Sequence, residues 1–208
     1  MEVDHTFWYL TRAAGFVAYL LLFSAISLGL LLTGGLPGRL QRFQTYDLHR
    51  FLALLALAVT LFHVLIVLPD RFIGFTVAEL LLPFASPYEP LYMYLGVFSL
   101  YLLVIVIGSF YLRSLVSYRI WRYIHFSTSA AFALALVHGL GAGSDASTGW
   151  ALAVYGVTGS AVLVLTARRI FGGRTRGLSP RPSISGRHRH GWHPGTRVSG
   201  QPAQGGPD

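Results

Sequence analysis

The chain of 208 residues contains no cysteine and no lysine, and it has only eight acidic residues. Without cysteine there can be no disulfide, no thiolate zinc site, no iron–sulfur cluster and no covalently attached c-type haem. All 16 basic residues are arginine, and the formal net charge is +8. Hydrophobic residues make up 53% of the sequence and charged residues only 12%, which is typical of an integral membrane protein rather than of a soluble domain.

Five hydrophobic segments contain no Asp, Glu, Lys or Arg. Each is long enough to cross a hydrocarbon core of about 30 Å, and Gly and Pro residues separate them. They comprise residues 13–32, 51–68, 91–112, 123–143 and 149–167. The shorter apolar stretch 73–85 carries Glu79, so we expect an interfacial or re-entrant helix there. The sequence therefore predicts an all-α membrane bundle of five transmembrane helices plus one short interfacial helix.

Arginine is unevenly distributed over the loops of this predicted bundle. The loop after the first span, the loop after the third and the C-terminal side are rich in arginine, whereas the N-terminus and the other two loops contain only Arg12 and Arg71. Cytoplasmic loops carry the excess of positive charge in membrane proteins. We therefore expect a multi-pass protein of the plasma membrane, with its N-terminus outside and its C-terminus in the cytoplasm. The basic charge follows from topology and contact with anionic lipid, so no nucleic acid partner is expected.

The predicted membrane domain comprises residues 1–171, and residues 172–208 are rich in Gly, Pro, Ser and Arg. Such a composition predicts a disordered basic cytoplasmic tail. The tail holds His188, His190 and His193, which could bind a metal ion loosely. A solvated polar tail is the preferred interpretation, because no fixed ligand geometry exists there.

Four other histidines lie in or beside the spans and form two pairs. His49 and His63 are 14 residues apart, and His125 and His138 are 13 apart. At a rise of about 1.5 Å per residue, each pair extends roughly 20 Å along a helix, most of the hydrocarbon thickness. Imidazole is costly in lipid unless it faces a partner. We expect two stacked metal centres, and haem is the centre that best suits a membrane helix bundle.

The predicted topology sorts the four histidines into two layers. The second and fourth spans both run outward, so His49 and His125 share the inner layer, while His63 and His138 share the outer one. A haem with two histidine ligands has no open coordination position, and it therefore suits electron transfer. An alternative for His49 is a lone interfacial histidine without a ligand role, since it lies at the mouth of its span.

Helix geometry adds a constraint on the second pair. At about 100° per residue, a 14-residue step returns to within about 40° of the same face, whereas a 13-residue step misses it by about 140°. His125 and His138 therefore need a tightened turn between them, or haems on different sides of the helix. Ser127, Thr128 and Ser129 follow His125. Their hydroxyls can bend a helix by hydrogen-bonding to the carbonyl four residues before.

Several arginines lie where they could neutralise haem propionates, because guanidinium binds carboxylate bidentately. Arg50, Arg119 and Arg122 are close to the inner layer in the sequence, and positive-inside anchoring is their alternative role. Arg12, at the outer end of the first span, could pair with an outer propionate or only extend to the interface. Aromatic residues at the span ends, Trp121 among them, are interpreted as interface belts.

The segments DLHRFLALLALAVTLFH and YRIWRYIHFSTSAAFALALVHG resemble the ferric reductase-like transmembrane domain. That family includes ferric reductases, NADPH oxidases and the haem-binding subunit of the bacterial methionine sulfoxide reductase system, and the resemblance covers roughly residues 7–171. It implies haem b, with His49 and His125 as ligands of an inner haem and His63 and His138 as ligands of an outer one. A histidine at position 49 favours the two-haem version of this family.

These observations predict a component of an oxidoreductase that passes electrons across the membrane through two stacked haems. The tail has no Gly-rich dinucleotide fingerprint and no room for a flavin or nicotinamide domain. We therefore expect a separate donor, either a cytoplasmic flavoprotein reductase or a membrane quinol, and an outer acceptor that the sequence does not identify. Two alternatives stay open: a one-haem, quinol-linked subunit of a periplasmic reductase, and a transporter or scaffold whose histidines bind protons or metal ions.

Overall fold

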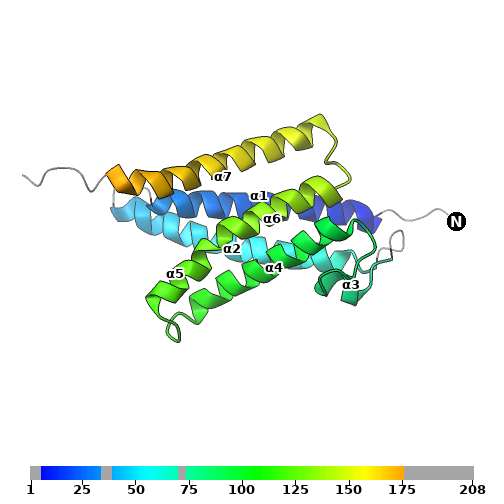
Figure 1. The fold of residues 1–208 in the computed structure, drawn as a ribbon, viewed down its shortest axis with the longest axis horizontal. Coiled ribbons are helices and arrows are strands. Elements are labelled where there is room, and N and C mark those ends of the chain that lie inside the picture. The colour runs from blue at the N-terminus through cyan, green and yellow to red at the C-terminus, as the bar shows by residue number, and fades with distance from the viewer. Residues whose placement is uncertain (1–5, 34–38, 70–73, 176–208) are drawn as a thin grey trace, which may run out of the picture. The chain divides into compact units, whose positions relative to one another are not determined.

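The computed structural model describes residues 6–33, 39–69 and 74–175, all within the compact unit Met1–Gly177. These residues form helices joined by short loops, without strands in the described ranges (Figure 1). The helices are α1 (Thr6–Thr33), α2 (Arg39–Ile66), α3 (Val77–Leu81), α4 (Pro90–Tyr111), α5 (Tyr118–Phe126), α6 (Thr128–Ala142) and α7 (Gly149–Thr175).

Five helical segments are long and apolar enough to cross a membrane, and α5 and α6 together make the fourth of them. This confirms the all-α architecture of a multi-pass membrane protein. The helices are longer than the apolar runs that predict them: α1 begins at Thr6 and α2 at Arg39. Helical hydrogen bonding of the backbone extends beyond the apolar run into residues at the membrane–water interface. Hydropathy alone does not detect these residues. Helix α7 likewise extends to Thr175, four residues into the predicted tail; the rest of that tail, from residue 176, lies outside the described residues.

The fourth span is interrupted where the sequence predicts a bend. Helix α5 ends at Phe126 and α6 begins at Thr128. The Ser127 hydroxyl donates to the carbonyl oxygen of Ile124, and the Thr128 hydroxyl donates to that of His125, both at 2.6 Å. The acceptors lie three residues back, not the four that we expected. The Ser127 amide also donates to the carbonyl oxygens of Ile124 and Tyr123, at 3.1 and 3.2 Å, so the turn is partly tightened toward a 3₁₀ helix. This break places His125 and His138 on two separate helices.

The predicted helix within residues 73–85 is present but shorter, as α3. Its N-terminus carries a capping box, in which the Thr76 hydroxyl accepts from the Glu79 amide and the Glu79 carboxylate accepts from the Thr76 amide. The charge of Glu79, which excludes a sixth span, thus stabilises the start of this short helix.

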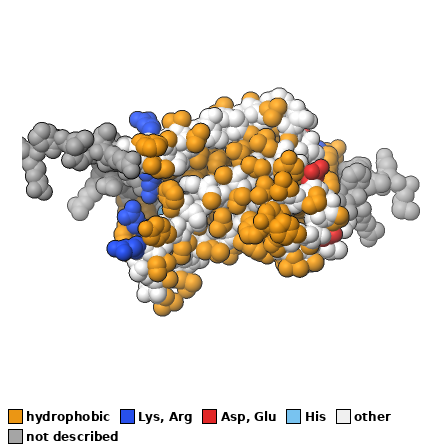
Figure 2. Space-filling model, viewed as in Figure 1, with side chains coloured by type: hydrophobic (Ala, Val, Ile, Leu, Met, Phe, Trp, Pro, Cys, Tyr) orange, Lys and Arg blue, Asp and Glu red, His pale blue; other side chains and the backbone are white. Residues whose placement is uncertain are grey.

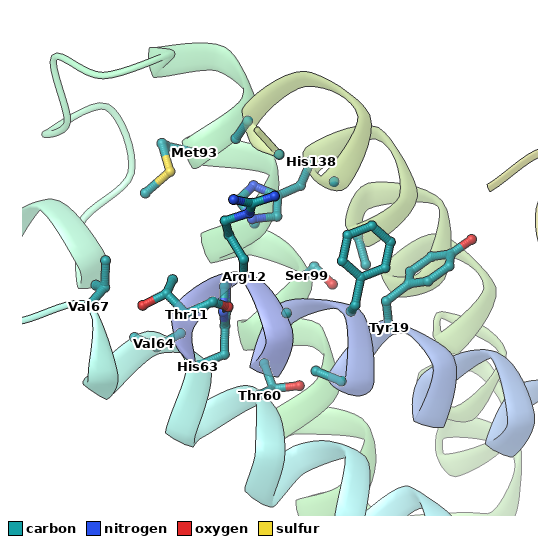
Figure 3. Close-up of a pocket in the computed structure, with 18 of the residues that line it drawn as sticks. Thr11, Arg12, Tyr19, Thr60, His63, Val64, Val67, Met93, Ser99 and His138 are labelled. Carbon is teal, nitrogen blue, oxygen red and sulfur yellow. The ribbon is translucent and has the colours of Figure 1, made fainter. Parts of the chain in front are cut away.

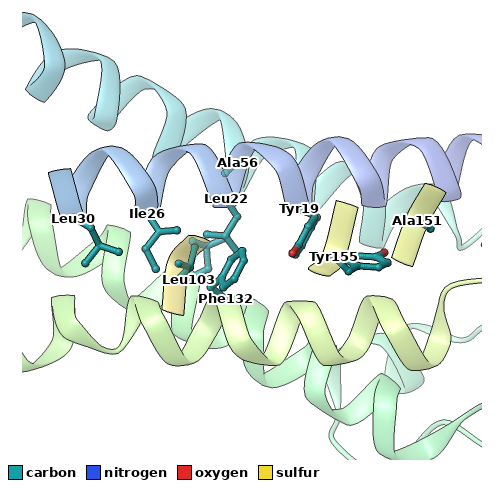
Figure 4. Close-up of a cluster of buried hydrophobic side chains, with 10 residues drawn as sticks. Tyr19, Leu22, Ile26, Leu30, Ala56, Leu103, Phe132, Ala151 and Tyr155 are labelled. Atoms are coloured by element: carbon teal, nitrogen blue, oxygen red, sulfur yellow. The ribbon is translucent and has the colours of Figure 1, made fainter. Parts of the chain in front are cut away.

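Helix α1 is central to the bundle, and α2 and α7 run beside it, while α4 packs on α6 (Figure 1). The core cluster contains Tyr19, Leu22 and Ile26 of α1, which face Phe132 of α6 and Tyr155 of α7 (Figure 4). The Tyr19 and Thr158 hydroxyls are hydrogen-bonded at 2.6 Å, which joins α1 to α7 in the interior. Lipid lacks hydrogen-bonding partners, so such internal pairing satisfies polar groups that the bundle buries.

Charged side chains gather at the two ends of the bundle (Figure 2). One end, at the start of α5, has Arg119 and Arg122, and Arg169 of α7 lies beside it. We call this the inner end and the opposite one the outer end. The broad surface between them is mostly apolar (Figure 2), as expected for helices that face lipid.

Candidate functional site

The four histidines occupy three helices, and all are half-buried. His49 and His63 lie on α2, His125 on α5 and His138 on α6. The rings of His49 and His125 have centroids 6.2 Å apart at the inner end. His63 and His138 line one cavity toward the outer end (Figure 3). The structure thus brings the predicted inner partners together and the predicted outer partners together.

Three of the four imidazoles make the same hydrogen bond. The Nδ1 atoms of His49, His63 and His138 lie 2.8, 2.9 and 2.8 Å from the carbonyl oxygens of Ala25, Thr11 and Tyr92. A carbonyl oxygen only accepts, so Nδ1 must carry the proton and donate. The lone pair then resides on Nε2, which is the arrangement that metal-binding histidines normally have.

The same three rings pack closely against glycines of the neighbouring helices. An ideal Cβ at Gly15 would lie 3.0 Å from Cε1 of His63, and one at Gly29 would lie 3.0 Å from Cε1 of His49. At Gly96 it would lie 2.7 Å from Nδ1 of His138. A glycine inside a helix costs about 1 kcal/mol relative to alanine, so close approach of the rings is the structural reason for these three.

The three contacts share one pattern, which we call the histidine cradle: a helix carbonyl accepts from Nδ1, and the glycine four residues later contacts the ring. The cradles are Thr11/Gly15 and Ala25/Gly29 on α1, and Tyr92/Gly96 on α4. The two on α1 are 14 residues apart, as are the two histidines of α2 that they hold. A four-residue step returns nearly to the same helix face, so each cradle presents both features to one ring.

His125 is the exception. Its ring stacks on that of Trp121, with centroids 5.2 Å apart and 16° between the planes. On α4, Gly108 has no neighbouring atom within 4 Å of its ideal Cβ, so His125 does not use it as a cradle. The helix break at Ser127 separates His125 on α5 from α6, whose His138 lies in the cradle on α4. Trp121, interpreted from the sequence as part of an interface belt, instead contacts a candidate ligand.

We predict that Trp121→Leu loosens the inner pair. Aromatic pairs contribute about 0.5–1.5 kcal/mol, so removing this stack should weaken haem binding at the inner layer by up to about tenfold. Titration of haem-depleted protein with haem, followed by absorbance, measures this. Trp150→Leu is the control, because Trp150 packs on Phe16 at 4.8 Å in a different part of the bundle. Equal haem affinity in the two variants would contradict a role of Trp121 in holding His125.

The outer cavity has a volume of about 220 Å³. Its lining is mostly apolar, with His63, His138, Arg12 and Asp145 among the polar groups (Figure 3 shows the first three). Typical small-molecule pockets hold about 300–1,000 Å³. A macrocycle between the two histidines would therefore extend beyond this cavity at part of its edge.

Arg12 has a partner that the sequence alone does not reveal. Its Nε donates to Asp145 at 2.9 Å, and a second guanidinium nitrogen forms an ion pair with the other carboxylate oxygen. The guanidinium also lies over the ring of Trp8, 4.2 Å from its centroid. Arg12 therefore joins α1 to the loop between α6 and α7 at the outer cavity. Its role toward a propionate stays a prediction.

We predict that Asp145→Asn destabilises the protein. The two side chains are only 27% and 16% exposed, so the variant leaves a poorly solvated guanidinium without its counter-charge. Loss of one partner from such a pair should cost roughly 1–3 kcal/mol, less than for a fully buried pair. Thermal unfolding in detergent measures this, with Asp47→Asn at an exposed site of α2 as the control. An unchanged melting temperature of Asp145→Asn would show that the ion pair does not stabilise the fold.

Two of the arginines near the inner layer lie over aromatic rings. Arg50 lies over Phe110 at 5.4 Å, and Arg122 lies over Tyr118 at 5.8 Å. Both are exposed. Arg119 and Arg122 line an open cavity at the inner end. Their role toward a propionate therefore stays a prediction.

The donor set suits a haem better than a bare ion. Each layer supplies two imidazoles, whereas a protein-bound ion such as zinc normally takes three or four protein ligands; a porphyrin supplies four nitrogens itself. Among the described residues, no three His, Asp or Glu side chains cluster around one point. The ring centroids of His49 and His125 are 6.2 Å apart, close enough for both imidazoles to contact one bound group.

Buried polar atoms without hydrogen-bond partners near the histidines also indicate a site for a bound molecule. In the described structure, hydrogen-bond partners are absent for the buried side-chain atoms Thr11 Oγ1, Ser27 Oγ, Trp121 Nε1 and Thr166 Oγ1. The Thr11 carbonyl accepts from His63, and the Trp121 ring stacks on His125. Buried polar atoms are almost always paired, so groups that remain unpaired beside both layers are consistent with a site for a further molecule.

In comparisons with protein-family models, with curated proteins and with solved structures, nothing matches the chain. The resemblance to the ferric reductase-like domain therefore rests on the histidine pattern, and the function rests on the site itself.

Proposed function

We propose that the protein is a b-type haem subunit that transfers electrons across the plasma membrane. Two haems would be held by His49 with His125 and by His63 with His138, and they would supply the one-electron chemistry. The observation that carries this proposal is the repeated cradle, in which three histidines in a membrane bundle keep Nδ1 on a carbonyl and so keep the lone pair on Nε2.

The residues of the chain contribute three things to this function. The cradles fix the tautomer and orientation of His49, His63 and His138, which favours a strong and rigid ligand field. The mostly apolar lining of the outer cavity would keep water away from a bound haem. With less water to reorient, the reorganisation energy of electron transfer would be lower. The position of one pair toward each end of the bundle shortens the distance that an electron must cross in lipid.

Electron supply and use would lie with other molecules. A cytoplasmic flavoprotein reductase or a membrane quinol would be the donor, and an acceptor at the outer end would complete the reaction. The excess of arginine at the inner end supports an N-terminus outside and a C-terminus in the cytoplasm.

Liposomes test the proposal directly. The purified full chain, loaded with haem, is placed in vesicles that enclose ferricyanide, and a membrane-impermeant reductant is added outside. We expect enclosed ferricyanide to be reduced with the wild-type chain and reduction to fall to the rate of empty vesicles in His63→Ala. Equal rates in wild-type and empty vesicles would contradict transmembrane electron transfer.

A one-haem protein is the second candidate, because His125 lacks the cradle that the other three histidines share. In that case only His63 and His138 would bind haem, and a quinol would deliver electrons to this outer site. The variant His49→Ala separates the two versions: haem content per chain falls by about half for two haems and is unchanged for one.

A further inference from the structure

A second cavity lies at the inner end, distinct from both histidine pairs. It has a volume of about 420 Å³ and is open to the surface. Helix α5 supplies most of its lining and α7 supplies Arg169. The lining residues are Tyr118, Arg119, Arg122, Tyr123, Phe126 and Arg169. No histidine is among them, so the cavity lies beside the candidate metal ligands and does not include them.

Three guanidinium groups line this cavity, and none of them forms an ion pair with a carboxylate of the described residues. In the part of the chain that the structure describes, the one ion pair between side chains is that of Arg12 and Asp145, at the outer end. Arg122 lies over the Tyr118 ring at 5.8 Å, and Arg169 lies over the Phe126 ring at 6.0 Å. The aromatic rings thus hold two of the guanidinium groups in place, while their N–H donors remain available.

Three like charges around one cavity repel one another, and an anion bound among them relieves that repulsion. Guanidinium matches the oxygens of a phosphoryl group bidentately, and the hydroxyls of Tyr118 and Tyr123 are further donors. A carboxylate would engage one guanidinium in this way, whereas the several oxygens of a phosphoryl group can engage two or three. The composition of the lining therefore favours phosphate over carboxylate.

The position of the cavity agrees with this chemistry. It opens at the end of two membrane-spanning segments, where the headgroups of a bilayer lie. Tyr118 and Tyr123 are 70% and 73% exposed, as is usual for aromatic side chains at that level. We propose that Arg119, Arg122 and Arg169 form a binding site for a phosphoryl group, whether of an acidic phospholipid or of free phosphate. This site does not depend on haem.

The site also adjoins the inner histidine. Tyr118 stacks on Trp121 with centroids 6.0 Å apart, and Trp121 stacks on His125. The rings of Tyr118 and Trp121 therefore lie between an anion in the cavity and His125. The charge of the anion would act on any group bound at the inner layer. Trp121 is at the same time a natural fluorescent reporter of the cavity.

The test uses the full chain in neutral detergent, titrated with three probes: a short-chain phosphatidylglycerol, a short-chain phosphatidylcholine and inorganic phosphate. Tryptophan fluorescence and melting temperature are the readouts. We expect binding of phosphatidylglycerol, weakened at least about tenfold in the triple variant Arg119→Gln, Arg122→Gln, Arg169→Gln. Arg113→Gln is the control, because Arg113 lies over Phe110 outside the cavity and carries the same charge.

The probes separate the two sources of the phosphoryl group. Binding of phosphatidylglycerol well ahead of phosphate supports a lipid headgroup, and equal binding of the two supports free phosphate. Equal affinity of the triple variant and Arg113→Gln for every probe would overturn the proposal, as would equal binding of phosphatidylcholine and phosphatidylglycerol. If the triple variant fails to fold, the single variants Arg119→Gln and Arg169→Gln are expected to show the same loss in part, and unchanged affinity in both would likewise overturn it.

Discussion

The variants His63→Ala and His138→Ala are each expected to lose the outer haem, so that haem per chain falls from about two to about one. Both imidazoles line the outer cavity, and no other histidine of the described residues lines it, so neither can be replaced by a neighbour. Removing one would leave a five-coordinate haem that binds more weakly. Haem content of purified protein, expressed with adequate haem supply, is the measurement.

The matched control for this experiment is Thr60→Ala. Thr60 lines the same cavity from the same helix as His63, but its hydroxyl bonds to the Ala56 carbonyl of its own helix. Haem content should therefore stay at the wild-type value in this variant. Full haem content in both histidine variants would contradict the assignment of the outer pair, while loss in Thr60→Ala as well would indicate a general defect of folding.

Gly96→Ala is expected to have the second largest effect. The new methyl group would lie 2.7 Å from Nδ1 of His138, so the ring must move and its hydrogen bond to the Tyr92 carbonyl must lengthen or break. Overpacking of this kind costs about 1–3 kcal/mol, more than the roughly 1 kcal/mol that alanine gains in a helix. We expect outer-site affinity for haem to fall by about tenfold to a hundredfold, measured by titration of haem-depleted protein.

Gly108→Ala is the control within the same helix. Nothing lies within 4 Å of its ideal Cβ, so the methyl group meets no neighbour. The melting temperature of Gly108→Ala should be unchanged or slightly raised, and its haem binding should be that of the wild type. Equal haem affinity in Gly96→Ala and Gly108→Ala would show that the cradle does not position His138.

Hydropathy predicts the five spans because charge is costly in lipid, so each span appears in the sequence as a long apolar run without charged residues. The partners of each histidine are harder to predict. His49 and His63 bond to carbonyls, and every residue has a carbonyl, so only the opposing glycine is visible in a sequence. Gly15 and Gly29 do carry that signal, since they share the 14-residue spacing of the two histidines. The antiparallel register of α1 and α2 is needed to interpret it.

Other features depend on tertiary contact and leave no local pattern. The ion pair of Arg12 with Asp145 joins residues 133 positions apart. The stack of Trp121 on His125 follows a four-residue step along α5, but an interfacial tryptophan has the same sequence neighbourhood. The bend at Ser127 could be predicted, because serine and threonine hydroxyls near a helix interior compete for its carbonyls.

The central claim is that two pairs of histidines hold two haems, and the haem-to-protein ratio of the purified full chain tests it most directly. With adequate haem during expression, we predict about two non-covalent b-type haems per chain, with the absorbance bands of a low-spin, six-coordinate iron after reduction. Protein that is folded and yet shows no haem absorbance would contradict the account.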